Sequence, residues 1–197
     1  GELQLRRIAE MSGMDQHINF DEQVAVDDES RPDMIVYLPN GGQIPLDAKA
    51  PMSSYFEAIE ASDDGVRQAK LQDHARAMRG RVRELSQRRY WDRLEKSTDF
   101  VVMFVPSESC MSAALAIEPA LLEDAIRDKV MLATPTTLLA LLKTVAFGWQ
   151  QMQISENAHK IAEEARELHQ RMLKFADHSN KLSKQLKNAV EAHNDMV

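Results

Sequence analysis

A short β-hairpin is predicted between residues 31 and 51, RPDMIVYLPNGGQIPLDAKAP, and its register constrains how the rest of the chain can pack. An even-numbered loop would mix apolar and charged side chains on one face of the hairpin. A three-residue loop of residues 39–41, with Gly41 in the left-handed conformation of a bulged turn, avoids this mixing. The pairs that result are Leu38 with Gly42, Val36 with Ile44 and Met34 with Leu46. One face of the hairpin is therefore expected to be wholly apolar.

The same register gathers three charged side chains. Asp33 falls opposite Asp47, with Cβ atoms about 4.5–5.5 Å apart, and Lys49 lies two residues further on the same face. Two carboxylates this close repel each other unless a cation lies between them. Because Mg²⁺ takes one or two carboxylates plus waters and a substrate phosphate, Asp33 and Asp47 are predicted to bind Mg²⁺ or Mn²⁺. Lys49 is then placed to orient or deprotonate a water and to neutralise charge on a phosphate, unless it forms only a surface salt bridge with an aspartate.

Strands and helices alternate along the remaining chain, which predicts an α/β layering with a central mixed sheet. FVVMFVP, from Phe100, is a continuous apolar run typical of a strand covered on both faces. Besides the hairpin, strands are expected at residues 20–26, 100–106 and 130–135, and helices at 2–12, 66–95, 111–127 and 136–152. Glu108, just after the run at Phe100, is expected either to cap the following helix or to face the carboxylate site.

The last forty-odd residues carry a heptad repeat, in which mostly apolar residues fall at alternating four- and three-residue steps. Neither Pro nor Gly interrupts it. The repeat consists of Ile154, Ala158, Ile161, Ala165, Leu168, Met172, Phe175, Ser179, Leu182, Leu186, Ala189, His193 and Met196. We therefore divide the chain into a domain of residues 1–153 and a coiled-coil-type helix of residues 154–197. This helix is expected to self-associate or pair with another helix; the alternative is that it folds back on its own domain.

Composition excludes several classes of protein. Hydrophobic residues make up 44% and charged residues 28%, as in a globular domain, and no apolar run reaches the length of a membrane span. The single cysteine, Cys110, excludes an internal disulfide, so a reducing cytoplasm is expected. The sequence opens on Gly1 within a predicted helix, which indicates a fragment whose missing N-terminal part is a candidate for a membrane anchor.

The net charge of −7 conceals a basic segment. Residues 66–96 contain 10 Lys or Arg and 4 acids (10 − 4 = +6), whereas residues 1–65 contain 4 and 14 (4 − 14 = −10). A basic helix of this kind suits a polyanion, and arginine binds phosphate in bidentate geometry. The candidate contacts to the phosphates of a nucleic acid are Arg76, Arg79, Arg83, Arg88 and Arg89. The alternative is a solvated helix face that pairs with the acidic first third of the chain.

The motifs together resemble known families. Asp33 after Pro32, followed by Asp47-Ala48-Lys49, resembles the signature of the PD-(D/E)XK nuclease superfamily. Over nearly the whole chain, the sequence resembles the RmuC family of bacterial DNA recombination proteins. The matching segments are GELQL, RPDMIVYLP, DAKAP, DFVVMFVPSE, LATPTTLLALLKTVAFGWQQ and ENAHKIAEEARELHQRM.

The resemblance implies a restriction-endonuclease-like domain and a Mg²⁺-dependent DNA nuclease that hydrolyses phosphodiester bonds. Asp33, Asp47 and Lys49 would take the roles given above. Superfamily members often add a glutamate from the first helix, and Glu2 matches that place as a further metal ligand, although acids are also favoured at helix starts by the dipole. Two alternatives stay open: a DNA-binding or scaffolding protein without turnover, and an assembly module that works through its heptad helix.

Overall fold

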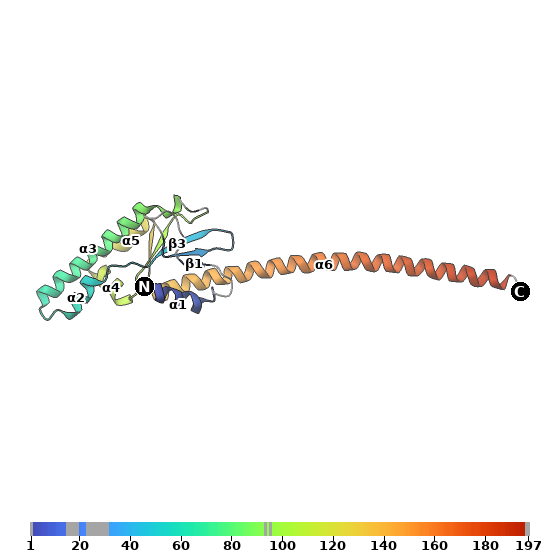
Figure 1. Ribbon diagram of the computed structural model, residues 1–197, viewed down its shortest axis with the longest axis horizontal. Helices are drawn as coiled ribbons and strands as arrows, with labels where there is room; N and C mark the ends of the chain where they lie inside the picture. The colour runs from blue at the N-terminus through green and yellow to red at the C-terminus, as the bar shows by residue number, and fades with distance from the viewer. Residues whose placement is uncertain (1, 15–19, 23–31, 93, 95, 196–197) are drawn as a thin grey trace. The chain divides into compact units, whose positions relative to one another are not determined.

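The computed structural model describes residues 2–14, 20–22, 32–92, 94 and 96–195, and for residues 2 and 20–22 it describes the backbone only. The chain divides into two compact units, Gly1–Trp149 and Gln150–Val197. The first unit holds the sheet and most of the helices (Figure 1). The boundary predicted at residues 153 and 154 stays a prediction.

The first unit is a mixed α/β structure. In chain order its elements are α1 (Glu2–Ser12), β1 (Phe20–Glu22), β2 (Met34–Tyr37), β3 (Gln43–Asp47), α2 (Ser53–Glu60), α3 (Asp64–Arg88), the short 3-10 helix η2 (Tyr90–Asp92), β4 (Val101–Phe104), α4 (Glu108–Ile117), α5 (Leu121–Arg127), β5 (Val130–Ala133) and the start of α6 (Pro135–Asn194). The five strands form one sheet in the order β1-β2-β3-β4-β5. The pairs β1/β2 and β2/β3 are antiparallel, whereas β3/β4 and β4/β5 are parallel, so the predicted mixed sheet is confirmed.

The register of the predicted hairpin is confirmed at every pair. Met34 lies opposite Leu46 and Val36 opposite Ile44. The loop closes through hydrogen bonds from the Gly41 amide to the Leu38 carbonyl (2.9 Å) and from the Leu38 amide to the Gly42 carbonyl (2.8 Å). Gly41 has φ of +79°, the left-handed conformation that a residue without Cβ adopts most readily. Matching of apolar side chains therefore set this register correctly.

The two faces of the sheet bury separate cores. Met34, Val36, Ile44, Leu46, Val102 and Phe104 lie on the face covered by α1 and the first turns of α6. Val101, Met103 and Val105 lie on the face covered by α3, α4 and α5. The β3/β4 register pairs Asp47 with Met103, so the Asp47 side chain enters the α3 side of the sheet. The Asp47 carboxylate thus lies at the edge of the apolar core between the sheet and α3.

The expected helices differ from the observed ones at three places. The helix predicted over residues 111–127 is wrong: α4 ends at Ile117 and α5 begins at Leu121, because Pro119 lacks the amide that a continuous helix needs. The helix predicted to reach residue 95 ends at Arg88 and is followed by η2. The helix α2 was not predicted. Of the strand expected at residues 20–26, β1 covers Phe20–Glu22, and the remainder lies outside the described residues.

The helix α6 is one continuous helix of 60 residues that runs through both units. Its first part supplies Leu138, Leu142, Val145 and Ala146 to the core of the first unit. From residue 150 to residue 195 every residue is exposed. Within the described residues, no helix has the combination of length and apolar character that a bilayer crossing demands.

Candidate functional site

Asp33 and Asp47 lie at the end of the hairpin that is furthest from its loop. Asp33 immediately precedes β2 and Asp47 is the last residue of β3, so the register that pairs Met34 with Leu46 sets the two aspartates opposite each other on one face. The Asp33 Oδ2 atom accepts a hydrogen bond from the Ala48 amide at 2.7 Å, and this bond ties the ends of the two strands together. The ends of β2 and β3, which carry the two predicted carboxylates, are thus held together.

Lys49 joins this pair from the solvent side. Its Nζ atom lies 3.5 Å from Asp33 Oδ1, and its side chain is 68% exposed. The Asp33 side chain is 9% exposed, but water competes for the exposed Lys49 ammonium and weakens the pair. The Lys49 ammonium is therefore free to approach a bound anion at little cost to the fold.

Asp47 is buried, with 1% of its side chain exposed, and it belongs to a closed ring of four charged groups. Arg81 Nη2 donates to Asp47 Oδ1 at 2.8 Å, and Arg81 Nη1 donates to Glu84 Oε2 at 2.6 Å. Arg88 Nη2 donates to Glu84 Oε1 at 2.5 Å, and Arg88 Nη1 lies 3.6 Å from Asp47 Oδ2. We call these four residues the Asp47 ring. It links the end of β3 to the last two turns of α3.

The charges of the ring shift the pKa of Glu84 and the pKa of Arg81 in opposite directions. The hydrogen bond from Arg81 lowers the pKa of Glu84 and outweighs the opposing effect of partial burial. Burial acts to lower the pKa of Arg81, but the hydrogen bonds to Asp47 and Glu84 prevail and raise it. Burial raises the pKa of Tyr90, whose hydroxyl accepts a hydrogen bond from Arg88 Nη1 at 3.0 Å. These shifts favour the charged forms of Glu84 and Arg81 and the neutral form of Tyr90.

Arg81 and Glu84 were not among the predicted site residues. The available signal was their spacing: Arg81, Glu84 and Arg88 fall at i, i+3 and i+7, so all three occupy one face of α3. That spacing identifies a charged face of the helix. It does not identify Asp47, 34 residues away in sequence from Arg81, as the group that the face meets.

The chemistry of this site fits a divalent cation at two oxygens. Among the described residues, Asp47 Oδ2 is buried without a hydrogen-bond donor, and Asp33 Oδ1 lies 3.5 Å from the exposed Lys49 ammonium. Carboxylate oxygens are the ligands that Mg²⁺ and Mn²⁺ prefer. Among the residues that the structure describes, no group of three or more His, Cys, Asp or Glu side chains is placed to hold a metal ion. Glu2 begins α1, and its side chain lies outside the described part of the chain.

The five arginines predicted to contact DNA fall into different environments. Arg88 belongs to the Asp47 ring. Arg76 pairs with Asp73 at 2.8 Å and Arg89 with Asp92 at 2.7 Å, both on exposed surface. Arg79 and Arg83 line a cleft of about 330 Å³ between α3 and α5. These arginines do not form one continuous stripe.

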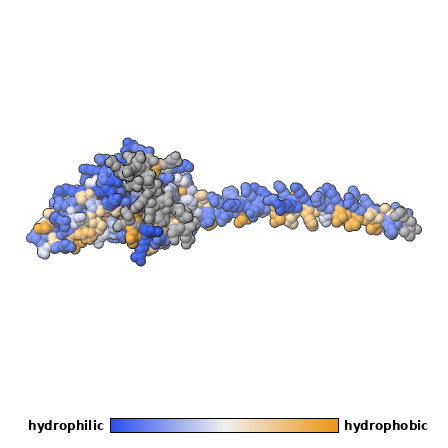
Figure 2. All heavy atoms as spheres, in the orientation of Figure 1, coloured by the Kyte–Doolittle hydropathy of each residue, from blue (hydrophilic) through white to orange (hydrophobic). Residues whose placement is uncertain are grey.

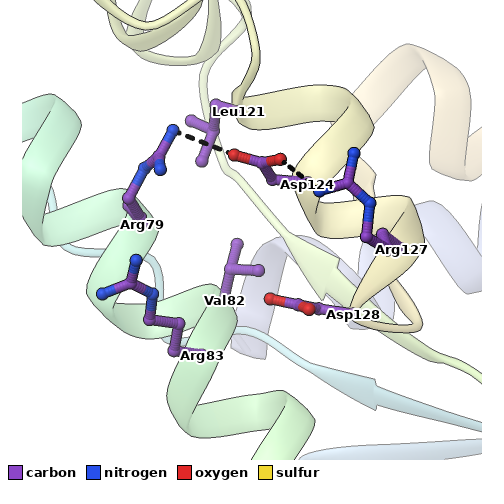
Figure 3. Close-up of a pocket in the computed structure, with 7 residues that line it drawn as sticks. All are labelled: Arg79, Val82, Arg83, Leu121, Asp124, Arg127 and Asp128. Atoms are coloured by element: carbon purple, nitrogen blue, oxygen red, sulfur yellow. Dashed lines mark hydrogen bonds and ion pairs between the residues drawn. The ribbon is translucent and has the colours of Figure 1, made fainter.

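The cleft between α3 and α5 contains both signs of charge (Figure 3). Arg79 donates to Glu118 at 2.6 Å and lies 3.1 Å from Asp124, which also pairs with Arg127. Arg83 is exposed and has no ion-pair partner among the described residues. Carboxylates thus engage most of the positive charge of this cleft, and Arg83 is its one guanidinium left for a phosphate within the described structure.

One further candidate, Glu108, takes a structural role. Ser107, not Glu108, is the N-cap of α4, where it accepts a hydrogen bond from the Cys110 amide at 3.3 Å. Glu108 Oε1 instead accepts from the Thr136 amide at the start of α6, and hydrogen bonds from Thr134 and Thr136 lower the pKa of Glu108. The expectation that Glu108 caps its own helix is wrong.

The fold and this site define a mixed α/β protein with a candidate centre for binding ions. The centre lies at the end of the hairpin, where two aspartates, the exposed Lys49 and the largely buried Arg81 are found. The chain belongs to the RmuC family, whose family model matches residues 1–197. It is 40% identical over 200 residues to the DNA recombination protein RmuC homolog of Zymomonas mobilis, covering all of this chain and 45% of that protein. The DNA recombination protein RmuC of Escherichia coli K12 is 34% identical over 194 residues, which is 96% of this chain and 41% of that protein.

The homolog from Chlamydia muridarum is 36% identical over 198 residues and again covers all of this chain and 45% of the relative. The chain therefore spans less than half the length of the curated relatives that it matches. No solved structure matches the chain.

Proposed function

We propose that this chain is the core of a metal-dependent DNA nuclease of the PD-(D/E)XK type that acts in DNA recombination. The observation that carries the proposal is the hairpin register, which opposes Asp33 and Asp47 and leaves Lys49 3.5 Å from Asp33. The names of the relatives, DNA recombination proteins, support DNA as the substrate. The buried Asp47 Oδ2 atom, for which the described part of the chain supplies no hydrogen-bond donor, supports a cation ligand at that position.

Each side chain of the site has a definite task in this proposal. Asp33 and Asp47 hold Mg²⁺ or Mn²⁺, and the Ala48 amide and Arg81 fix the orientation of the two carboxylates. The bound cation supplies Lewis-acid stabilisation of a phosphate and activation of a water. Lys49, exposed beside Asp33, orients the attacking water and offsets the negative charge that develops on the phosphate. Glu2 completes the ligand set as a third carboxylate, and the exposed Arg83 contacts the DNA backbone.

A second candidate is a DNA-binding or scaffolding protein that keeps this domain without turnover. The Asp47 ring favours it, because Arg81 and Arg88 already compensate the charge of Asp47. In this case Asp47 serves stability, and the metal ligand set stays incomplete.

Cleavage of a DNA substrate by the Lys49→Ala variant tests the proposal. Lys49 is exposed, so its removal is expected to leave the fold intact, to abolish cleavage of plasmid and single-stranded DNA with Mg²⁺ or Mn²⁺, and to leave Mn²⁺ affinity unchanged. Lys143→Ala is the matched control, because Lys143 is also exposed and lies on α6, which carries none of the proposed site residues. DNA binding that falls steeply with salt, with no cleavage by the unaltered chain under either metal, would replace the nuclease by the scaffolding protein.

A further inference from the structure

The part of α6 from residue 150 to residue 195 presents an apolar stripe that is exposed among the residues that the structure describes. Figure 2 shows hydrophobic residues gathered along one side of the helix and hydrophilic residues along the other. The large apolar members of the heptad repeat are each 58% to 75% exposed: Ile154, Ile161, Leu168, Met172, Phe175, Leu182 and Leu186. A stripe of this length on an isolated helix is apolar surface that a second helix can remove from water.

We propose that this stripe pairs with a second copy of the chain in an antiparallel coiled coil, in which residue n of one helix lies opposite residue 340 − n of the other. The proposal is independent of any nuclease activity. It rests on the sizes of the side chains along the stripe and on the distribution of charge along the helix.

Side-chain size argues against a parallel, in-register pair. In such a pair each residue faces its own copy, so Ala158, Ala165 and Ser179 would each form a layer of two small side chains, while Phe175 would face Phe175. Layers of this kind alternate between cavities and crowding, and both are destabilising. The small residues therefore need large residues opposite them.

The antiparallel register supplies large residues opposite the small ones. In antiparallel coiled coils an a position faces a d position, so the two sets of stripe residues meet each other. Its layers are Ile154 with Leu186, Ala158 with Leu182, Ile161 with Ser179, Ala165 with Phe175, and Leu168 with Met172, each occurring twice. Each of the three small residues now faces a large one, which is the interdigitation that well-packed helix pairs show. The register 347 − n sets Ala158 opposite Ala189 and loses this match, whereas 333 − n keeps it, so side-chain size leaves two registers.

Charge along the helix favours the 340 − n register. Residues 171–187 contain five Lys or Arg and one acid (5 − 1 = +4), whereas residues 153–169 contain two Lys or Arg and four acids (2 − 4 = −2). The 340 − n register places each of these two segments against the other. A parallel pair would instead place the +4 segment against its own copy, and like charges at that distance repel.

Sedimentation of the 197-residue chain, together with spin-label distances, tests the proposal. Cys110 is buried, and burial raises its pKa to about 11, so a cysteine introduced on the helix surface is labelled selectively. With a label at Lys184→Cys, the antiparallel register offsets the two labels by 28 residues along the helix axis, and the distance between them is about 45 Å once the width of two helices is included. A parallel pair gives about 20 Å between the same two labels. At Gln170→Cys, the centre of the antiparallel register, both arrangements give about 20 Å, which serves as the positive control.

A charged substitution within the stripe gives the second measurement. Leu168→Glu buries two carboxylates at the centre of the pair and is expected to raise the dimer dissociation constant by roughly a hundredfold or more. Leu173→Glu is the matched control, because Leu173 is 59% exposed but lies outside the stripe, and it is expected to leave the dissociation constant unchanged. A monomer at all protein concentrations, a short distance at residue 184, or equal effects of the two glutamates would each overturn the proposal.

Discussion

Asp47→Asn is expected to destabilise the first unit strongly, because it removes one charge from the Asp47 ring and keeps the shape of the side chain. Asp47 is 1% exposed and Arg81 is 12% exposed, so the loss leaves a largely buried guanidinium with one carboxylate fewer. Removing one partner of a buried ion pair costs about 3–5 kcal/mol. Glu84 stays 2.6 Å from Arg81 and 2.5 Å from Arg88, so the low end of this range, about 3 kcal/mol, is expected.

Urea unfolding followed by tryptophan fluorescence measures this cost, since Trp91 and Trp149 both lie in the first unit. With a slope of about 2 kcal/mol per M, a loss of about 3 kcal/mol lowers the urea midpoint by about 1.5 M. Asp33→Asn is the matched control: Asp33 keeps its place opposite Asp47, but its cation partner is the exposed Lys49, and a cost of about 1 kcal/mol is expected. Equal costs for the two substitutions would refute the reasoning, because they would show that burial within the ring adds nothing.

Three further results are expected. Gly41→Ala lowers the free energy of unfolding by about 1 kcal/mol because φ is +79° there, whereas Gly80→Ala, inside α3 with open space around it, raises it by about 0.5–1 kcal/mol; urea midpoints measure both. Cys110 does not react with a maleimide at pH 8 in the folded chain and reacts once urea unfolds it, since burial raises its pKa to about 11; fast labelling without urea would contradict this. The hydrogen bond from Arg81 lowers the pKa of Glu84, so the stability that Glu84 contributes is complete above pH about 4.5 and is lost as pH falls through its folded pKa. Glu84→Gln is therefore expected to lower the melting temperature at pH 6 and to leave it unchanged at the acid end of a pH series.

The hairpin was predictable because a single physical requirement decides it. Only one register buries Met34, Val36 and Leu46 on a common face, and a slip of one residue would expose all of them. That requirement acts over fewer than twenty residues of sequence, so local patterning was enough to oppose Asp33 and Asp47.

The partners of Asp47 were not predictable in the same way. Its contact with Arg81 spans 34 residues and depends on where α3 lies on the sheet, which local patterning does not determine. The basic segment was predicted as a surface for DNA, yet Arg88 faces inward to the ring. A run of Lys and Arg residues shows that a helix is basic. Only the packing of the helix decides which of these side chains form ion pairs within the domain. The break at Pro119 is a different case, since a local rule was available and periodicity across residues 111–127 was given too much weight.

The Asp47 ring also determines how far the hairpin can act as an independent module. Residues 32–50 contain everything needed to choose their own register, but the carboxylate at their end obtains its counter-charges from the last turns of α3. A hairpin excised from this chain, or grafted onto another sheet, would carry an uncompensated buried acid into its new setting. Transplanting the motif therefore requires α3 to travel with it.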